Sequence, residues 1–101
     1  MYELTKEDIQ NLVNYKEYLM SVRGSCNDMA YKMLLTRSID LLEGDITSQT
    51  MLKYLEHVKS NKGAKAELSE ETKAANKEVI KKADEFHLHA IINKIMKSMK
   101  K

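Results

Sequence analysis

The pattern of apolar and polar positions along this chain is helical almost throughout. After Thr5, apolar residues recur at intervals of three and four, which is the spacing of one helix face. These residues are Ile9, Leu12, Val13, Leu19 and Met20. Thr5 is a good N-cap residue, and the acids Glu7 and Asp8 follow it where the helix dipole favours them. Because Gly24 is typical of the position just past a helix end, the pattern predicts a helix over residues 6–22.

A second helix is predicted after the connection at residues 25–28, and we expect it to be the most buried element. Its apolar residues cover much of its circumference; they are Ala30, Met33, Leu34, Leu35, Ile39, Leu41 and Leu42. A helix of this kind has neighbours on more than one side. We therefore expect Leu34 and Leu41 in the core and Gly44 at the helix end. On this interpretation, Leu34→Ala would cost about 2–5 kcal/mol of stability.

Two further helices are predicted to begin after Thr47 and Ser69, since both residues are good N-caps. The third helix carries the apolar residues Met51, Leu52, Leu55 and Val58 and ends near Gly63. The polar segment 62–67 is the best candidate for a linker, although it is too short to separate two domains. The chain is therefore predicted to form a single helical domain over residues 1–101.

The last helix, from about residue 70 to about residue 99, is too long for a core of this size. One row of its apolar residues comprises Val79, Ala83, Phe86 and Ala90, and a second row on nearly the opposite side comprises Leu88, Ile92, Ile95 and Met99. Either the helix breaks near residues 84–88 or its two halves pack against different surfaces. The predicted fold class is all-α: a small bundle of four to five helices, with the last helix long or broken near residues 84–88.

The second row also predicts contact with another molecule. Its spacings of four, three and four are those of a seam between two helices. A helix of about 30 residues is also more than a monomer of this size usually carries. Two tyrosines off the main row of the first helix could support the contact. The predicted partner-binding residues are Tyr15, Tyr18, Leu88, Ile92, Ile95 and Met99, with residues 86–101 as the interaction segment. We expect either a homodimer or docking onto a partner protein.

The methionines and the overall composition fit a small binding protein. Most of the seven methionines fall on or beside apolar rows and are interpreted as core filler. Hydrophobic residues make up 43% and charged residues 32% of the chain, as in soluble domains, and no apolar run is long enough to span a bilayer. The acidic, polar start of the sequence is unlike a secretory signal. With the single Cys26, these features predict a cytoplasmic protein that does not enter membranes.

Charge makes nucleic acid a possible partner without favouring it. The net charge is only +2, although residues 59–101 alone carry a balance of +5. Fifteen of the seventeen basic residues are lysines, whereas base recognition relies heavily on arginine.

A helix-turn-helix motif is the alternative that this charge distribution leaves open. The short turn at residues 44–47 joins two predicted helices in the manner of that motif. A DNA-binding regulator of this kind would use residues 30–60 and would present Gln49, Thr50 and Lys53 to the duplex. Three acids lie where the phosphate backbone would pass: Glu43, Asp45 and Glu56. We therefore rank DNA binding second to protein binding.

No pattern indicates catalysis, a cofactor or a metal. The sequence has no glycine-rich phosphate loop and no nucleophile elbow, and one cysteine cannot form a paired-cysteine zinc site. His87 and His89 would point in nearly opposite directions on a helix, so that they cannot share a metal; we expect His87 to be partly buried and His89 to face solvent. Cys26 precedes a predicted helix, yet no histidine lies nearby in the sequence to activate it.

These observations predict a non-enzymatic protein-binding or regulatory protein. In composition it is similar to the small lysine- and methionine-rich accessory proteins of bacteria and phages, a likeness carried by no motif.

Overall fold

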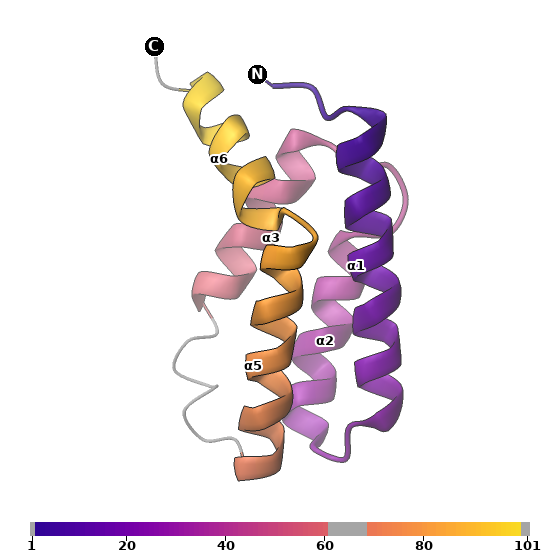
Figure 1. Ribbon diagram of the computed structural model, residues 1–101. Coiled ribbons are helices and arrows are strands. Elements are labelled where there is room, and N and C mark those ends of the chain that lie inside the picture. The colour runs from indigo at the N-terminus through magenta and orange to yellow at the C-terminus, as the bar shows by residue number, and fades with distance from the viewer. Residues whose placement is uncertain (1, 61–68, 100–101) are drawn as a thin grey trace.

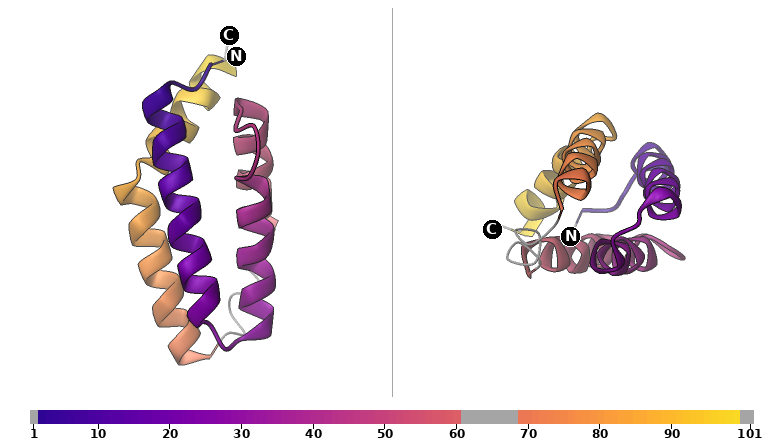
Figure 2. Two further views of the ribbon diagram at one scale, coloured as in Figure 1. Left: turned by 90° about the vertical axis from the view of Figure 1, so that its right-hand side faces the viewer. Right: turned by 90° about the horizontal axis from the view of Figure 1, so that it is seen from below.

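The computed structural model describes residues 2–60 and 69–99, which form five α-helices and no strand. In chain order the helices are α1 (Lys6–Ser25), α2 (Met29–Leu41), α3 (Ser48–Ser60), α5 (Glu70–Glu85) and α6 (Leu88–Met99) (Figure 1). Viewed along the long axis, α1 forms one side, α2 and α3 together form a second, and α5 with α6 form the third (Figure 2). The predicted all-α bundle is confirmed.

The helix starts follow the capping chemistry of the sequence. The Thr5 hydroxyl accepts a hydrogen bond from the Asp8 N–H at 3.0 Å, and the Asp8 carboxylate accepts one from the Thr5 N–H at 3.1 Å. This reciprocal pair is a capping box. Thr47 and Ser69 each accept a hydrogen bond of 3.2 Å from a backbone N–H three residues later, at the starts of α3 and α5. All three predicted N-caps are confirmed, and Asp28 caps α2 in the same way.

Two of the glycines differ in their effect on helix ends. As predicted, Gly44 lies just past the end of α2. Its φ of 76° is a left-handed conformation that glycine adopts at low cost. Gly24 lies inside α1, so that the predicted end at residue 22 is wrong. The helix continues to Ser25, whose hydroxyl bonds to carbonyls of the preceding turn, because glycine weakens a helix without forcing it to stop. Gly63 and the predicted linker at residues 62–67 lie outside the described residues.

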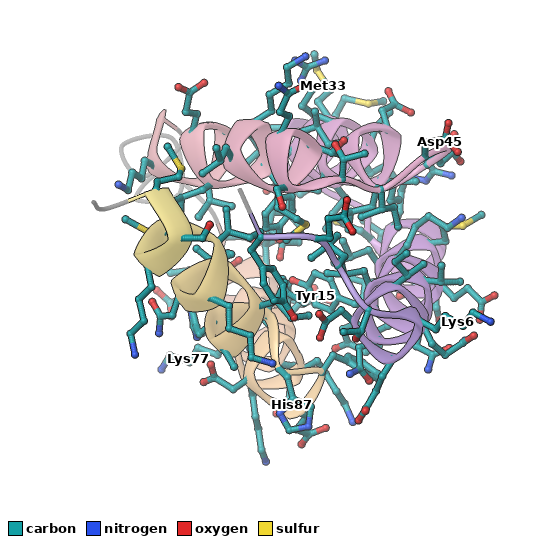
Figure 3. The ribbon with its side chains drawn as sticks, turned by 90° about the horizontal axis from the view of Figure 1, so that it is seen from above. Lys6, Tyr15, Met33, Asp45, Lys77 and His87 are labelled. Atoms are coloured by element: carbon teal, nitrogen blue, oxygen red, sulfur yellow. The ribbon has the colours of Figure 1, made fainter. Side chains whose placement is uncertain are left out.

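A break separates α5 from α6 within the predicted interval 84–88. Phe86 ends α5, and His87 adopts φ of 61°, which is uncommon for a residue with a side chain. Figure 1 shows α6 leaving the axis of α5 at this point. The expectation that His87 is partly buried was wrong. Because the break rotates His87 off the apolar row, its side chain is exposed and points away from the bundle (Figure 3).

All five helices contribute side chains to one core. The buried hydrophobic residues are Leu12, Tyr15, Leu19, Tyr31, Leu35, Ile39, Leu42, Ile46, Met51, Tyr54, Val79, Ala83, Leu88, Ile91, Ile92 and Ile95. Helix α2 is not the most buried element, since it buries three of its thirteen residues whereas α6 buries four of twelve. Leu34 and Leu41, which were expected in the core, are only half-buried. The helix instead turns its row of Tyr31, Leu35 and Ile39 inward.

The N-terminal segment, residues 2–5, crosses one end of the bundle and connects three helices (Figures 1 and 3). The Tyr2 N–H donates to the Ser98 hydroxyl on α6 at 2.8 Å, and the Tyr2 carbonyl accepts a hydrogen bond from Ser48 on α3. The Tyr2 hydroxyl donates to the buried Asp8 carboxylate on α1 at 2.6 Å. Lys94 of α6 lies 5.9 Å from the centre of the Tyr2 ring. These contacts fix the segment to α1, α3 and α6 together.

Asp8 is expected to make the stability of the fold depend on pH in the acid range. Burial alone would raise the pKa of Asp8, but hydrogen bonds from Tyr2 and Thr5 and the charge of Lys94 hold this pKa below its ordinary value of 3.8. A lowered pKa means that ionised Asp8 stabilises the fold above about pH 4, and that this stabilisation is lost as the pH falls through the lowered pKa.

Thermal unfolding followed by circular dichroism checks this expectation. The melting temperature of Asp8→Asn should fall less between about pH 6 and pH 2 than that of the unaltered chain. Asp40→Asn serves as the control, because Asp40 is exposed on α2. Parallel melting curves for Asp8→Asn and the unaltered chain would contradict the role given to Asp8.

Candidate functional site

The structure divides the six predicted partner-binding residues between the core and the surface. Four of them are buried: Tyr15, Leu88, Ile92 and Ile95. Tyr18 is half-buried beside α5, with the Lys82 ammonium group 5.9 Å from the centre of its ring. Among the six, only Met99 is exposed, at 53%. The break at His87 turns the second apolar row into the core, so that the four buried side chains form no exposed seam in the folded chain.

The alternative DNA-binding residues lie on the first turns of α3. Gln49 and Lys53 are exposed there, whereas Thr50 is half-buried, with its hydroxyl 3.1 Å from the hydroxyl of Thr47. Ser48, the first residue of the helix, is buried and donates a hydrogen bond to the backbone of the N-terminal segment. One side of this helix end is therefore covered by the chain itself, which limits its access to a DNA groove.

Most of the described methionines are on the surface, contrary to the interpretation as core filler. Only Met51 is buried among them. The exposed large hydrophobic side chains of the described residues are Ile9, Met20, Met29, Met33, Ile80, Met96 and Met99. Met29 and Met33 are the most exposed, at 70% and 68%. They lie one turn apart on the outer side of α2, where Figure 3 shows Met33 at the periphery of the bundle.

A third exposed methionine, Met20, lies on the neighbouring helix α1 with 41% of its surface exposed. The Arg23 guanidinium group of α1 donates to the Thr36 hydroxyl of α2 at 3.4 Å, so that the two helices meet at this contact. Met20 lies one turn before Arg23, and Met33 lies one turn before Thr36. Because α1 and α2 run in opposite directions, the two methionines are displaced from this contact in opposite directions along the bundle. We refer to Met20, Met29 and Met33 as the methionine surface.

A cavity of about 140 Å³ lies among the five helices. The described residues that line it are Tyr15, Leu19, Tyr31, Leu34, Leu35, Ser38, Tyr54, Leu55, His57, Val58, Asn76, Val79, Ile80, Ala83, Leu88, His89 and Ile92. Its inner wall is made of core residues such as Leu35 and Val79. Its rim is made of half-buried Leu34 and Leu55 on one side and of exposed Ile80 on the other. The cavity is thus largely apolar and opens to the surface between α5 and the pair α2 and α3.

Tyrosine hydroxyls are the main polar groups inside the cavity. The Tyr31 hydroxyl donates to the Asn76 side chain at 3.0 Å. The hydroxyl oxygens of Tyr54 and Tyr15 lie 3.4 Å apart, which is long for a hydrogen bond between hydroxyls. Burial raises the pKa of all three tyrosines above the ordinary value of 10.0, because the charged form is poorly solvated there. The His57 ring lies 3.1 Å from the Ser38 hydroxyl, which joins α3 to α2 at the rim.

The inward row of α2 was not predicted because Tyr31 was left out of the apolar rows. Tyr31, Leu35 and Ile39 follow one another at intervals of four, so that counting tyrosine as apolar finds the inward row of α2. Tyr54 likewise lies one turn after the buried Met51 on α3.

Neither a metal-binding cluster nor a membrane-spanning helix is found among the described residues. No three histidine, cysteine, aspartate or glutamate side chains lie close enough there to hold a metal ion. His89 is exposed, as expected, and bonds to Asp84 across the break between α5 and α6. None of the described helices is both long enough and apolar enough to cross a bilayer.

Comparison with known proteins does not place the chain in a family. No protein-family model matches it, and no curated protein or solved structure is significantly similar to it.

Proposed function

We propose that this chain is a non-enzymatic protein-binding protein of the cytoplasm, which docks through its methionine surface onto another protein molecule. The observation that carries the proposal is the exposure of Met29 and Met33, at 70% and 68%, one turn apart on α2, with Met20 also exposed on the neighbouring helix. Methionine side chains are unbranched and polarisable, so that they adapt to the shape of a partner. Met29 and Met33, one turn apart on one helix, expose neighbouring apolar side chains, and apolar patches on a surface often mark interaction sites.

The partner that best fits this surface is a second copy of the chain. A two-fold contact places the same surface against itself, so that its charges must include both signs. The two helices that carry the methionines also expose both signs of charge: Glu17 and Asp40 are exposed acids, Arg37 is an exposed base and Arg23 is half-buried. A net charge of +2 also produces little repulsion between two copies.

The surroundings of Cys26 support a function without catalysis. A cysteine nucleophile needs a neighbouring base, which is usually histidine. The surface hollow beside Cys26 is lined, among described residues, by Ser25, Asn27, Asp28, Ser69, Glu71, Thr72 and Ala75, and no histidine is among them. Two histidines, His57 and His89, are bonded elsewhere, to Ser38 and Asp84.

Sedimentation equilibrium with two matched variants tests the proposal. We expect the unaltered chain to dimerise, and we expect Met33→Glu to weaken the dimer by about tenfold or more, because it places a charge in an apolar contact. Met99→Glu is the matched control, since Met99 is equally a surface methionine but lies at the far end of α6. Circular dichroism should show that both variants remain folded.

Three results would overturn the proposed docking surface. One is a chain that stays monomeric at the highest soluble concentration, and another is a dimer that Met33→Glu leaves unchanged. The third is a dimer that Met99→Glu dissociates while Met33→Glu does not, because the interface would then lie at the C-terminal end that the sequence pattern indicated. Binding to nonspecific duplex DNA that weakens steeply with added salt would instead support the DNA-binding alternative.

A further inference from the structure

The size of the central cavity limits what it can hold. An engineered protein cavity of about 150 Å³ lined by apolar side chains binds benzene, whereas sites for drug-sized ligands have volumes of about 300–1,000 Å³. The cavity in this chain, at about 140 Å³, therefore has room for a single six-membered ring with a small substituent. A lipid chain, a nucleotide or a helix from another protein is too large for it.

The lining of the cavity is uncharged. No lysine, arginine, aspartate or glutamate is among the described residues that line it. A carboxylate or ammonium ion entering such a space would lose its hydration without gaining a partner of opposite charge. The His57 ring lies at the rim, within hydrogen-bond distance of the Ser38 hydroxyl and the Leu34 carbonyl, and His89 is exposed and paired with Asp84. The lining therefore favours a neutral ligand.

The tyrosine hydroxyls provide one polar position in the apolar interior. The oxygens of Tyr15 and Tyr54 are 3.4 Å apart, so that the bond between them is weak. A ligand hydroxyl placed beside this pair can hydrogen-bond to both oxygens at normal distances. Both hydroxyls are protonated at neutral pH, as an ordinary tyrosine hydroxyl is, and can therefore donate as well as accept. Leu35, Val79 and Ala83 supply apolar contacts for the ring of the same ligand.

We propose that this cavity is a binding site for a small neutral molecule with one aromatic ring and one hydroxyl group, with the hydroxyl held by Tyr15 and Tyr54. The site is distinct from the methionine surface and does not depend on the proposed docking function. Its occupant would reach the cavity through the opening between α5 and the pair α2 and α3, where Leu34, Leu55 and Ile80 form the rim.

Titration of the full chain with three probes tests the proposal, with carbon-13 NMR of the methyl groups as the readout. We expect phenol and toluene to shift the methyl signals of Leu35, Val79 and Ala83 in a saturable manner. Benzoate, which has a similar ring but carries a charge, should not shift these signals. The exposed Ile9 is an internal reference, because its methyl groups lie outside the cavity.

Two tyrosine variants distinguish the hydroxyl contact from simple filling of an apolar space. Tyr54→Phe should weaken phenol binding about fivefold, which corresponds to one neutral hydrogen bond, and should leave toluene binding within about twofold. Tyr18→Phe is the control, since Tyr18 does not line the cavity. If Tyr54→Phe does not fold, Tyr15→Phe removes the other hydroxyl of the pair and is expected to have the same effect.

The proposal is wrong if neither phenol nor toluene produces saturable shifts, or if benzoate binds as well as phenol. It is also wrong if the shifts avoid Leu35, Val79 and Ala83, or if the hydroxyl variants weaken phenol and toluene equally.

Discussion

The substitution Ile95→Asp is expected to unfold this chain at room temperature. Ile95 is 0% exposed, on a helix that packs against α1, α3 and α5. An aspartate there has no described basic side chain to pair with inside the core, and burying an unpaired carboxylate costs several kcal/mol. That loss is comparable to the total stability of a small domain, which is about 5–15 kcal/mol. Far-ultraviolet circular dichroism should show the loss of helix directly.

Met99→Asp is the matched control for this experiment. Met99 lies on the same helix, four residues later, but is 53% exposed, so that the same charge remains in water. Its effect on the free energy of unfolding should stay within about 0.5 kcal/mol. A folded Ile95→Asp chain that has only lost self-association would show that Ile95 belongs to an intermolecular seam and not to the core.

The second large effect is expected for Leu35→Ala, which should destabilise the fold by about 2–5 kcal/mol. Leu35 is 3% exposed and faces the core between Tyr31 and Ile39. Leu34→Ala removes the same atoms one position earlier on the same helix, where the side chain is half-buried, and should cost only about 1 kcal/mol. Urea unfolding of the two variants under identical conditions measures the difference.

The two leucine variants test which apolar row of α2 faces the core, that of Leu35 as in the structure or that of Leu34 as the sequence predicted. A larger loss for Leu34→Ala than for Leu35→Ala would mean that α2 is rotated relative to the structure described above. Equal losses of unfolding free energy would mean that Leu34 is as buried in solution as Leu35. Contact with another molecule at the rim of the cavity would produce that result.

The parts of the fold that could be predicted are those whose chemistry is local. Thr5, Thr47 and Ser69 cap helices through hydrogen bonds to N–H groups only three residues away, and these interactions are visible in the sequence itself. The break near His87 was predictable for a related reason. The apolar row changes sides between Ala83 and Leu88, and one straight helix cannot direct both rows to a single core.

The parts that could not be predicted depend on packing between distant helices. Helix α2 has two apolar rows, and packing against α1 and α3 places the row of Leu35 inward; Tyr31, which marks that row, is partly polar and gives only a weak signal in the sequence. The exposure of Met33 follows from the same rotation. The cavity has no sequence signal of its own, because it is formed by side chains as far apart as Tyr15 and Ile92.

The attachment of Tyr2 to α3 and α6 has a consequence for the order in which the protein folds during its synthesis. The Tyr2 N–H and the Ser98 hydroxyl that accepts its hydrogen bond are 96 positions apart in the chain. Closing so long a loop requires most of the chain to be present and already compact. While α6 is still inside the exit tunnel, the segment before α1 has only the partners on α1 and α3 to bind. The segment before α1 is therefore among the last parts of the chain to reach its final position.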